Sequence, residues 1–284
     1  MADNVFETIS QAYYDLTAAE KKTADFVMKH HDETQYMSIA ELSEASGVAE
    51  ATVSRFCRRL GYKGYNAFKL AIANAAALGK QESEQLSGSI LEDDSLEDMS
   101  RKLYSADLSA LAETLECVDA VKISAAADCL EKAGKVLCMG QGGSMVMASE
   151  ASHLFSTVSG KFFPISDSHL QVIAAANMEA GDALLFFSYS GATREMAETL
   201  NVARARGAKV ILITRFPRSP GASLADVVLC CGSNEGPLQL SSVPAKIAQL
   251  FLLDILFSAY CRRNLERCRE SRARVAEALA EKHL

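Results

Sequence analysis

Apolar residues in the N-terminal part of the chain recur at helical spacing, with no strand-like alternation. Four helical segments follow one another up to about residue 78, with turn signals between them. Two segments begin with capping boxes, Thr17-Ala-Ala-Glu20 and Ser38-Ile-Ala-Glu41. In such a box the hydroxyl and the carboxylate each bind a free amide of the helix start. The pattern predicts an all-α domain over residues 1–78.

A helix-turn-helix is predicted inside this domain. A short helix over residues 39–45 stops before Gly47, which suits the left-handed conformation that ends many helices. A second helix is expected over residues 50–60, where Val53, Phe56 and Leu60 recur at spacings of three and four and face the core. Two helices joined by a tight, glycine-containing turn are typical of DNA-binding proteins.

Polar and basic residues make up the other face of this second helix. Residues near the start of a recognition helix contact base edges in the major groove, and basic residues further along contact phosphates. We therefore expect base contacts from Thr52, Ser54 and Arg55, and backbone contacts from Arg58, Arg59, Lys63 and Lys69. The alternative, that these are ordinary surface residues of a helical bundle, stays open at this point.

Past residue 105 the pattern changes to short apolar runs that alternate with helix-length segments. The expected strands cover residues 135–139, 161–165, 183–187, 209–213 and 226–230. Strands that alternate with helices form parallel sheets covered on both faces. The pattern predicts an α/β, doubly wound, five-stranded parallel sheet over residues 105–284.

The charge distribution separates the two parts. A chain of 284 residues with 49% hydrophobic content is long enough for two domains. The net charge of −7 argues against DNA binding, but the charges are unevenly distributed. Residues 51–80 hold six basic residues and no acidic one, whereas residues 81–100 hold seven acidic residues and no basic one. We interpret residues 79–104 as an acidic linker; either run could also be a solvated helix face.

Two glycine- and serine-containing turns follow expected strands. The first is Gly140-Gln141-Gly142-Gly143-Ser144, which lacks the third glycine of a dinucleotide fingerprint. The second is Ser188-Tyr189-Ser190-Gly191-Ala192-Thr193, where three Ser and Thr hydroxyls and the amides of a helix start could hold a phosphate. It lacks the lysine of a nucleotide-triphosphate loop. A turn with capping residues is the alternative.

Other features exclude several classes of protein. The eight cysteines are scattered through apolar segments without zinc-ligand spacing, so we expect reduced, mostly buried thiols, no metal and no cofactor. No uncharged apolar stretch of about 18 residues and no signal-like N-terminus is present. We therefore expect a cytoplasmic protein with no membrane partner.

Residues 38–69, SIAELSEASGVAEATVSRFCRRLGYKGYNAFK, closely resemble the helix-turn-helix of the RpiR (MurR/RpiR) family of regulators of sugar metabolism. The run from Ala51 to Tyr65 is the most specific part of the match. One departure is Ala49, where the family commonly has a serine that caps the recognition helix. Loss of that hydroxyl costs about 1 kcal/mol.

The two glycine-containing turns, in this order and spacing, resemble the sugar isomerase (SIS) domain that follows the helix-turn-helix in this family. The resemblance implies that Ser188, Ser190, Gly191 and Thr193 hold a sugar phosphate, with further contacts from Ser144 and Ser242. Thr214 is a weaker candidate. His169 lies between the second strand and its helix, a position that can face the ligand, and Gln171 follows it.

These expectations favour a sensor over an enzyme. Aldose–ketose isomerisation needs a positioned base, and no motif joins the available candidates, which are His169, Glu150, His153 and Glu235. We predict a regulator that binds double-stranded operator DNA and a phosphorylated sugar as a homodimer or homotetramer, with no catalytic residue. The charged segment from residue 261 to 284 is assigned to packing or dimerisation. The alternatives are an active sugar-phosphate isomerase with a fused DNA-binding domain, or an interaction protein, which would leave the phosphate loop unexplained.

Overall fold

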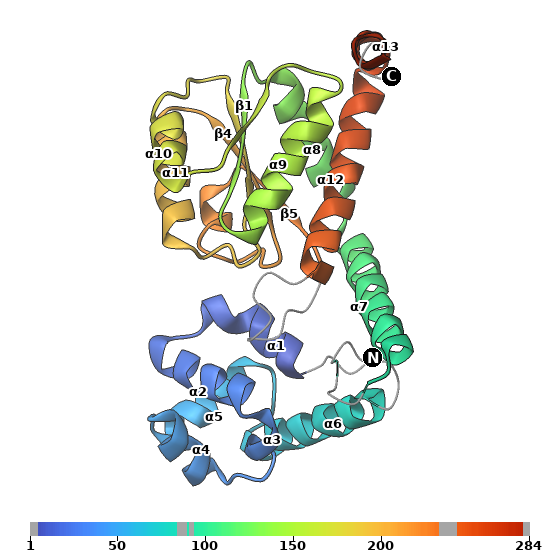
Figure 1. The fold of residues 1–284 in the computed structure, drawn as a ribbon. Helices are drawn as coiled ribbons and strands as arrows, with labels where there is room; N and C mark the ends of the chain where they lie inside the picture. The colour runs from blue at the N-terminus through green and yellow to red at the C-terminus, as the bar shows by residue number, and fades with distance from the viewer. Residues whose placement is uncertain (1–4, 84–89, 91–93, 233–242, 281–284) are drawn as a thin grey trace. The chain divides into compact units, whose positions relative to one another are not determined.

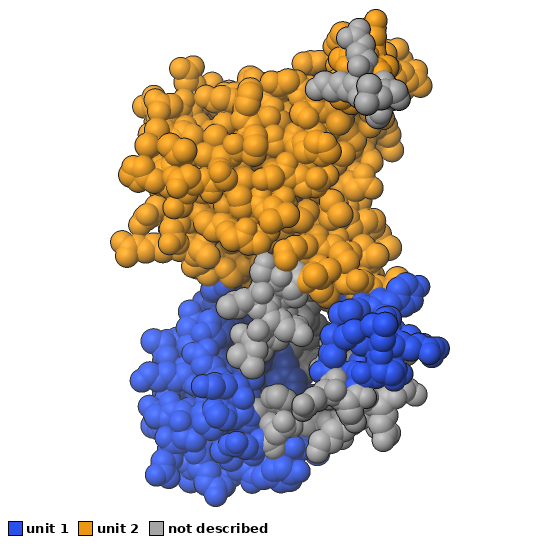
Figure 2. All heavy atoms as spheres, in the orientation of Figure 1, with its two compact units in different colours: residues 1–106, 236–238 blue, residues 107–235, 239–284 orange. Residues whose placement is uncertain are grey.

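The computed structural model describes residues 5–83, 90, 94–232 and 243–280. The chain divides into two compact units, one formed by residues 1–106 with 236–238 and the other by residues 107–235 with 239–284 (Figure 2). The boundary between them falls within one helix, between residues 106 and 107.

The first unit is helical, as the sequence predicts (Figure 1). Its elements are α1 Val5–Ala12, the 3-10 turn η1 Tyr13–Asp15, α2 Ala18–Lys29, α3 His31–Thr34, α4 Ile39–Ser46, α5 Glu50–Arg59 and α6 Tyr65–Ser83. Both expected capping boxes are formed, at Thr17 and Ser38. Gly47 ends α4 in the left-handed conformation, with φ 64°. The helix-turn-helix is therefore α4 and α5.

A single apolar cluster holds these helices together. Val53 and Phe56 of α5 are fully buried in it, and the Phe56 ring packs edge-on against Phe68 of α6 with centroids 5.4 Å apart. Leu42 of α4 and Val27 of α2 complete the packing around α5. Full burial of one such side chain is worth about 1.5–3 kcal/mol. The apolar stripe of α5 is thus fixed, and this leaves its opposite face to solvent.

A long helix, α7 Leu96–Cys117, begins inside the range expected to be the linker. Ser95 accepts a hydrogen bond from the amide of Asp98, and its hydroxyl donates to the Asp98 carboxylate. Acidic residues stabilise helix starts through the helix dipole. Glu97 and Asp98, which the sequence analysis counted toward the acidic linker, therefore belong to the first turn of a helix.

The second unit contains a five-stranded sheet with helices on both faces (Figure 1). After α7 its elements are α8 Ala120–Lys132, β1 Val136–Gly140, α9 Gly143–Ser156, β2 Phe162–Ile165, α10 Ser168–Ala176, β3 Ala183–Phe187, α11 Arg194–Ala205, β4 Lys209–Thr214, the 3-10 turn η2 Ala222–Leu224, β5 Val227–Cys230, α12 Val243–Arg263 and α13 Leu265–Ala280. The strand bounds match the expected ranges within one residue at each end.

All strand pairs are parallel, and the strand order is β2-β1-β3-β4-β5. The α/β doubly wound prediction is confirmed. The order reverses between β1 and β3, since the chain leaves β1 toward β2 on one side and returns to β3 on the other. In doubly wound sheets such a switch point opens a crevice at the carboxyl ends of the strands.

Alternate strand residues supply two separate cores. Leu185 and Phe187 of β3 face α8, α9 and α12, whereas Leu184 and Phe186 face α10 and α11. Side chains of a strand alternate between the two faces, so the central strands β1, β3 and β4 contribute to both cores. The rigid sheet positions the turns that leave its carboxyl edge.

The helix α12 is long and apolar enough to cross a membrane by length and composition alone. In the structure it packs on the sheet, with Leu252, Leu253 and Leu256 buried in the core. All eight cysteines are free, half of them buried and half partly exposed. Burial raises the pKa of the Cys138 thiol to about 12, which makes it a poor nucleophile.

Candidate functional site

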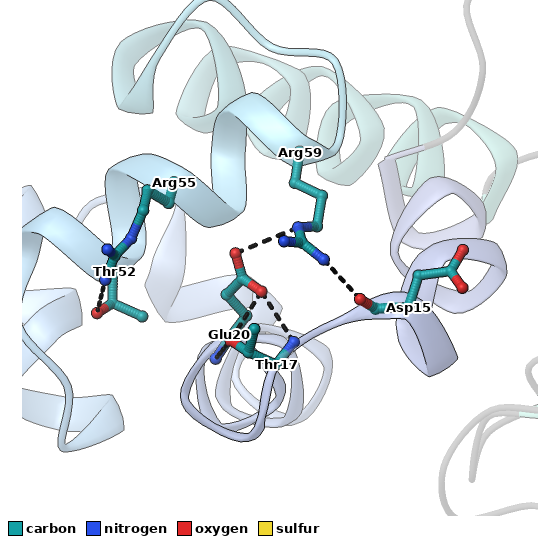
Figure 3. A network of polar contacts seen from close by, with 6 residues as sticks. All are labelled: Asp15, Thr17, Glu20, Thr52, Arg55 and Arg59. Atoms are coloured by element: carbon teal, nitrogen blue, oxygen red, sulfur yellow. Dashed lines mark hydrogen bonds and ion pairs between the residues drawn. The ribbon is translucent and has the colours of Figure 1, made fainter.

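The solvent-facing side of α5 carries three exposed arginines, Arg55, Arg58 and Arg59. Ser54 beside them is half-buried. The Thr52 side chain, expected to contact bases, is buried at 6% exposure, and its hydroxyl accepts a hydrogen bond from Arg55 Nη2 at 3.2 Å (Figure 3). Thr52 therefore orients Arg55, and any base contact of Thr52 remains a prediction.

The other basic residues expected to contact phosphates differ in their surroundings. Lys63, in the turn after α5, is exposed. Lys69 Nζ donates to the carbonyl oxygen of Tyr36 at 3.2 Å and so ties α6 to the chain ahead of α4. Arg59 contacts Glu20 and Asp15 (Figure 3). Lys63 thus lies open to a partner, while Lys69 and Arg59 already hold the bundle together.

In the second unit, the two glycine-containing turns leave neighbouring strands. Gly140 at the end of β1 is in register with Phe187 at the end of β3. The turn at residues 141–144 and the loop at residues 188–193 therefore start side by side at the switch point, where ligands bind in sheets of this kind. A Cβ on Gly140 would lie 2.7 Å from the carbonyl oxygen of Ser144, so the turn is tight enough to require glycine there.

Loop 188–193 is shaped by hydrogen bonds to its own hydroxyl groups. Ser188 Oγ accepts from the amide of Gly191 at 3.1 Å, and Ser190 Oγ accepts from the amide of Ala192 at 3.3 Å. Gly191 adopts a positive φ of 60°. Thr193 precedes α11 without capping it through its side chain. Three Ser and Thr hydroxyls thus lie in the short loop that leads into α11, and hydroxyls next to the free amides of a helix start suit an anion.

Two glutamine side chains join this loop to the turn after β1. Thr193 Oγ1 lies 3.5 Å from Gln141 Oε1, and Gln141 Nε2 donates to Gln171 Oε1 at 3.0 Å. Gln171 is fully buried, and its Nε2 donates to the carbonyl oxygens of Gly140 and Ile165 at 2.9 and 2.8 Å. Buried polar groups are costly unless hydrogen-bonded. This network fixes the two turns against the ends of β1 and β2.

The remaining expected residues are less closely joined. Ser144 is half-buried in the first turn of α9, and His169 is exposed in the first turn of α10 without a hydrogen bond or ion pair to any described residue. Glu150 and His153 pair with each other at 3.5 Å on the outer side of α9. Ser242 and Glu235 lie outside the described residues. Among these candidates the described structure assembles no acid–base pair beside the loop.

Two supports of loop 188–193 were missed or undervalued by the sequence analysis. Thr214, a weaker candidate for the ligand, is buried; its hydroxyl donates to the Tyr189 carbonyl oxygen at 3.0 Å. Ser219, which drew no attention, is 2% exposed and packs against Gly191. Thr214 is the last residue of β4, the strand beside β3, and Ser219 lies in the segment that follows it. The adjacency of the strands could have pointed to Thr214, but no local pattern marks Ser219.

Known families match both parts of the chain. Residues 3–79 match the helix-turn-helix domain of the rpiR family, and residues 129–259 match the SIS domain. A transcriptional regulator of the helix-turn-helix type from Haemophilus influenzae is 32% identical over 90% of this chain and 89% of its own length. The chain belongs to the RpiR family. It is an RpiR-family transcriptional regulator with a helix-turn-helix and a SIS domain.

Relatives and solved structures extend this assignment. The regulator HexR of Pseudomonas aeruginosa is 31% identical over 89% of this RpiR-family chain and 87% of its own. The structure of Vibrio vulnificus NanR in complex with ManNAc-6P covers 99% of this chain and 100% of its own, with 23% identity and a TM-score of 0.64. The sugar isomerase domain of an RpiR factor from Sphaerobacter thermophilus covers 63% of this chain and 98% of its own, at 22% identity and a TM-score of 0.58. These likenesses establish the shared fold.

Proposed function

We propose that this regulator binds operator DNA through α5 and senses a phosphorylated sugar at loop 188–193. The observation that carries the second half is the meeting of this loop with the turn after β1, joined through Gln141 at the switch point of the sheet. Phosphate oxygens would be bound by the hydroxyls of Ser188 and Ser190 and by the α11 amides. The sugar would then extend toward the turn at residues 141–144, where Ser144 lies.

The DNA-binding half rests on the exposed arginines of α5. Arg55 contacts base edges, with its guanidinium oriented by Thr52, while Arg58 and Lys63 contact phosphates. Such a protein would work in the cytoplasm, where its DNA lies. The relatives described above are named as transcriptional regulators, which supports a sensor in preference to an isomerase.

We also propose that the protein acts as a homodimer or homotetramer. One helix-turn-helix covers too little DNA for operator-level specificity, and two-fold symmetric half-sites meet this need in dimers. Exposed apolar side chains of α7 support association, since large exposed apolar patches mark interaction surfaces; they are Leu96, Leu103, Tyr104, Leu108 and Leu115.

The test of the sensor is a panel of sugar phosphates that includes glucose 6-phosphate, ribose 5-phosphate and N-acetylmannosamine 6-phosphate, with inorganic phosphate as the control. The full-length protein is assayed with each compound for a thermal shift and for turnover. We expect a shift from at least one sugar phosphate and no turnover. Turnover of any compound would support the isomerase alternative, and no shift from any sugar phosphate would contradict the sensor.

A further inference from the structure

Arg58 and Arg59 are neighbours at the end of α5, but they differ in their contacts. Arg58 is exposed and forms no hydrogen bond or ion pair with any described residue. Arg59 is turned back onto the start of α2, with its Nε 3.4 Å from Glu20 Oε1 and its Nη1 donating to the carbonyl oxygen of Asp15 at 2.6 Å (Figure 3). The two arginines therefore form a matched comparison, since both are exposed but only Arg59 has an ion pair and a hydrogen bond to other described residues.

Glu20 is the buried member of this ion pair. Its side chain is 4% exposed, against 44% for Arg59. One carboxylate oxygen, Oε2, accepts hydrogen bonds from the amide and the hydroxyl of Thr17, both at 2.8 Å. The other, Oε1, faces Arg59. Glu20 thus closes the capping box of α2 with one oxygen and holds the last turn of α5 with the other.

The charge state of Glu20 strengthens this arrangement. Burial by itself raises the pKa of the Glu20 carboxyl, but the hydrogen bonds from Thr17 and the charges of Arg59 and Arg55 outweigh it and hold the pKa below its usual value. Glu20 is therefore ionised at neutral pH. Without Arg59 this buried carboxylate would keep only its hydrogen bonds from Thr17, and an unpaired buried charge is unfavourable, which opposes transfer of Arg59 to a DNA phosphate.

We propose that Glu20 is a positioning residue for DNA binding, which fixes the end of α5 against α2 and withholds Arg59 from the DNA backbone. Arg55 and Arg58 are then the arginines of α5 that contact DNA, and Arg59, expected from the sequence to contact phosphates, is an internal anchor. This inference rests on the proposed role of α5 as the DNA-binding helix.

Salt dependence of DNA binding separates the two arginines, since each phosphate contact contributes about 0.9 to the slope of log affinity against log salt concentration. The probe is a mixed-sequence 30-base-pair duplex, titrated with the full-length protein at several salt concentrations. The matched variants are Arg58→Ala and Arg59→Ala. We expect Arg58→Ala to lower the slope by about 0.9 for each phosphate that Arg58 neutralises. Arg59→Ala should have the same slope as the wild type.

Two further variants keep the test decisive if Arg59→Ala alone is poorly folded. Glu20→Gln preserves an oxygen for the capping box but removes the ion pair with Arg59, which then keeps only its hydrogen bond to the Asp15 carbonyl oxygen. Affinity for the mixed-sequence duplex and the salt slope should both rise. The double variant Glu20→Gln with Arg59→Ala leaves no uncompensated buried charge and should return to the wild-type slope. Thermal unfolding of each variant confirms that it is folded at the titration temperature.

The outcomes distinguish this inference from the proposed function. A fall in slope for the double variant equal to that of Arg58→Ala would show that Arg59 contacts phosphate and would overturn the role of Glu20. An unchanged slope and affinity for a folded Glu20→Gln would do the same. If neither Arg55→Ala nor Arg58→Ala alters binding, α5 is not the DNA-binding helix, and the proposed function fails together with the inference.

Discussion

A Cβ atom on Gly191 would lie 2.0 Å from the hydroxyl oxygen of Ser219 and 2.6 Å from its Cβ. Ser219 is 2% exposed and is therefore packed against other residues on nearly all sides. The backbone of Gly191 also has a positive φ of 60°, which side chains other than hydrogen disfavour. Steric contact and backbone conformation therefore both require glycine at the centre of loop 188–193.

Gly191→Ala is accordingly expected to lower the free energy of unfolding by about 2–4 kcal/mol, from backbone strain and overpacking together. Gly181→Ala is the matched control, because Gly181 also has a positive φ but nothing within 4 Å of its Cβ position. It should cost only about 1–2 kcal/mol. Urea unfolding measures both variants, and equal decreases in stability would contradict the role of Ser219.

Ser190→Ala is expected to weaken effector binding more than tenfold, because a hydrogen bond to a charged group is worth about 1.5–3 kcal/mol. Ser156→Ala, an exposed serine at the end of α9, is the control and should bind like the wild type. Isothermal titration with whichever sugar phosphate shifts the wild type gives the affinities. DNA binding without effector should be preserved in both variants.

Coupling between the two ligands is reciprocal by thermodynamic necessity. Operator DNA must therefore change effector affinity by the same factor by which effector changes DNA affinity. The measurement is a pair of titrations of the wild type and of Ser190→Ala, each with and without the other ligand. A full effector response in Ser190→Ala, or no mutual effect in the wild type for any sugar phosphate, would show that loop 188–193 is not the sensor.

Arg55→Ala is expected to relax sequence discrimination by about 1–3 kcal/mol, as removal of a base-edge contact does. Lys63→Ala should instead weaken binding to all DNA alike and lower the salt slope. Competition between cognate and random duplexes separates the two effects. Equal decreases in affinity for both duplexes in Arg55→Ala would contradict its assignment to bases.

Light scattering should give at least twice the chain mass of 30.6 kDa. A helix-turn-helix regulator needs two half-sites for operator-level specificity, and a dimer supplies both. The measurement is made on the full-length protein with and without an operator duplex. A monomer that still bound its operator tightly would refute the proposed assembly.

Local patterns were sufficient to predict the two folds. The strands were located within one residue because apolar runs alternate with helical segments, and the helix starts at Thr17 and Ser38 carry their own capping signals. The turns after β1 and β3 were recognisable because glycine and serine follow apolar strands. The expected contacts of these residues with DNA and sugar phosphate remain predictions.

Contacts between distant residues were beyond local patterns. Gln141 and Gln171 are 30 residues apart, and Arg59 meets the carbonyl of Asp15 across 44 residues. Only packing of whole elements brings such pairs together. The burial of Thr52 could have been predicted from the sequence, because Thr52 lies four residues before the core residue Phe56 on the same helix.

The start of α5 differs from the starts of α2 and α4 because it has no side-chain cap. Ala49 precedes α5 and offers no side-chain hydrogen bond, whereas Thr17 and Ser38 cap α2 and α4. The first turn of α5 should therefore fray more often, and its amide hydrogens should exchange with solvent faster than those that begin α2 and α4. A DNA phosphate that settled on these amides would suppress the opening. The melting temperature of this unit would then rise with the fraction of the protein that is bound to DNA.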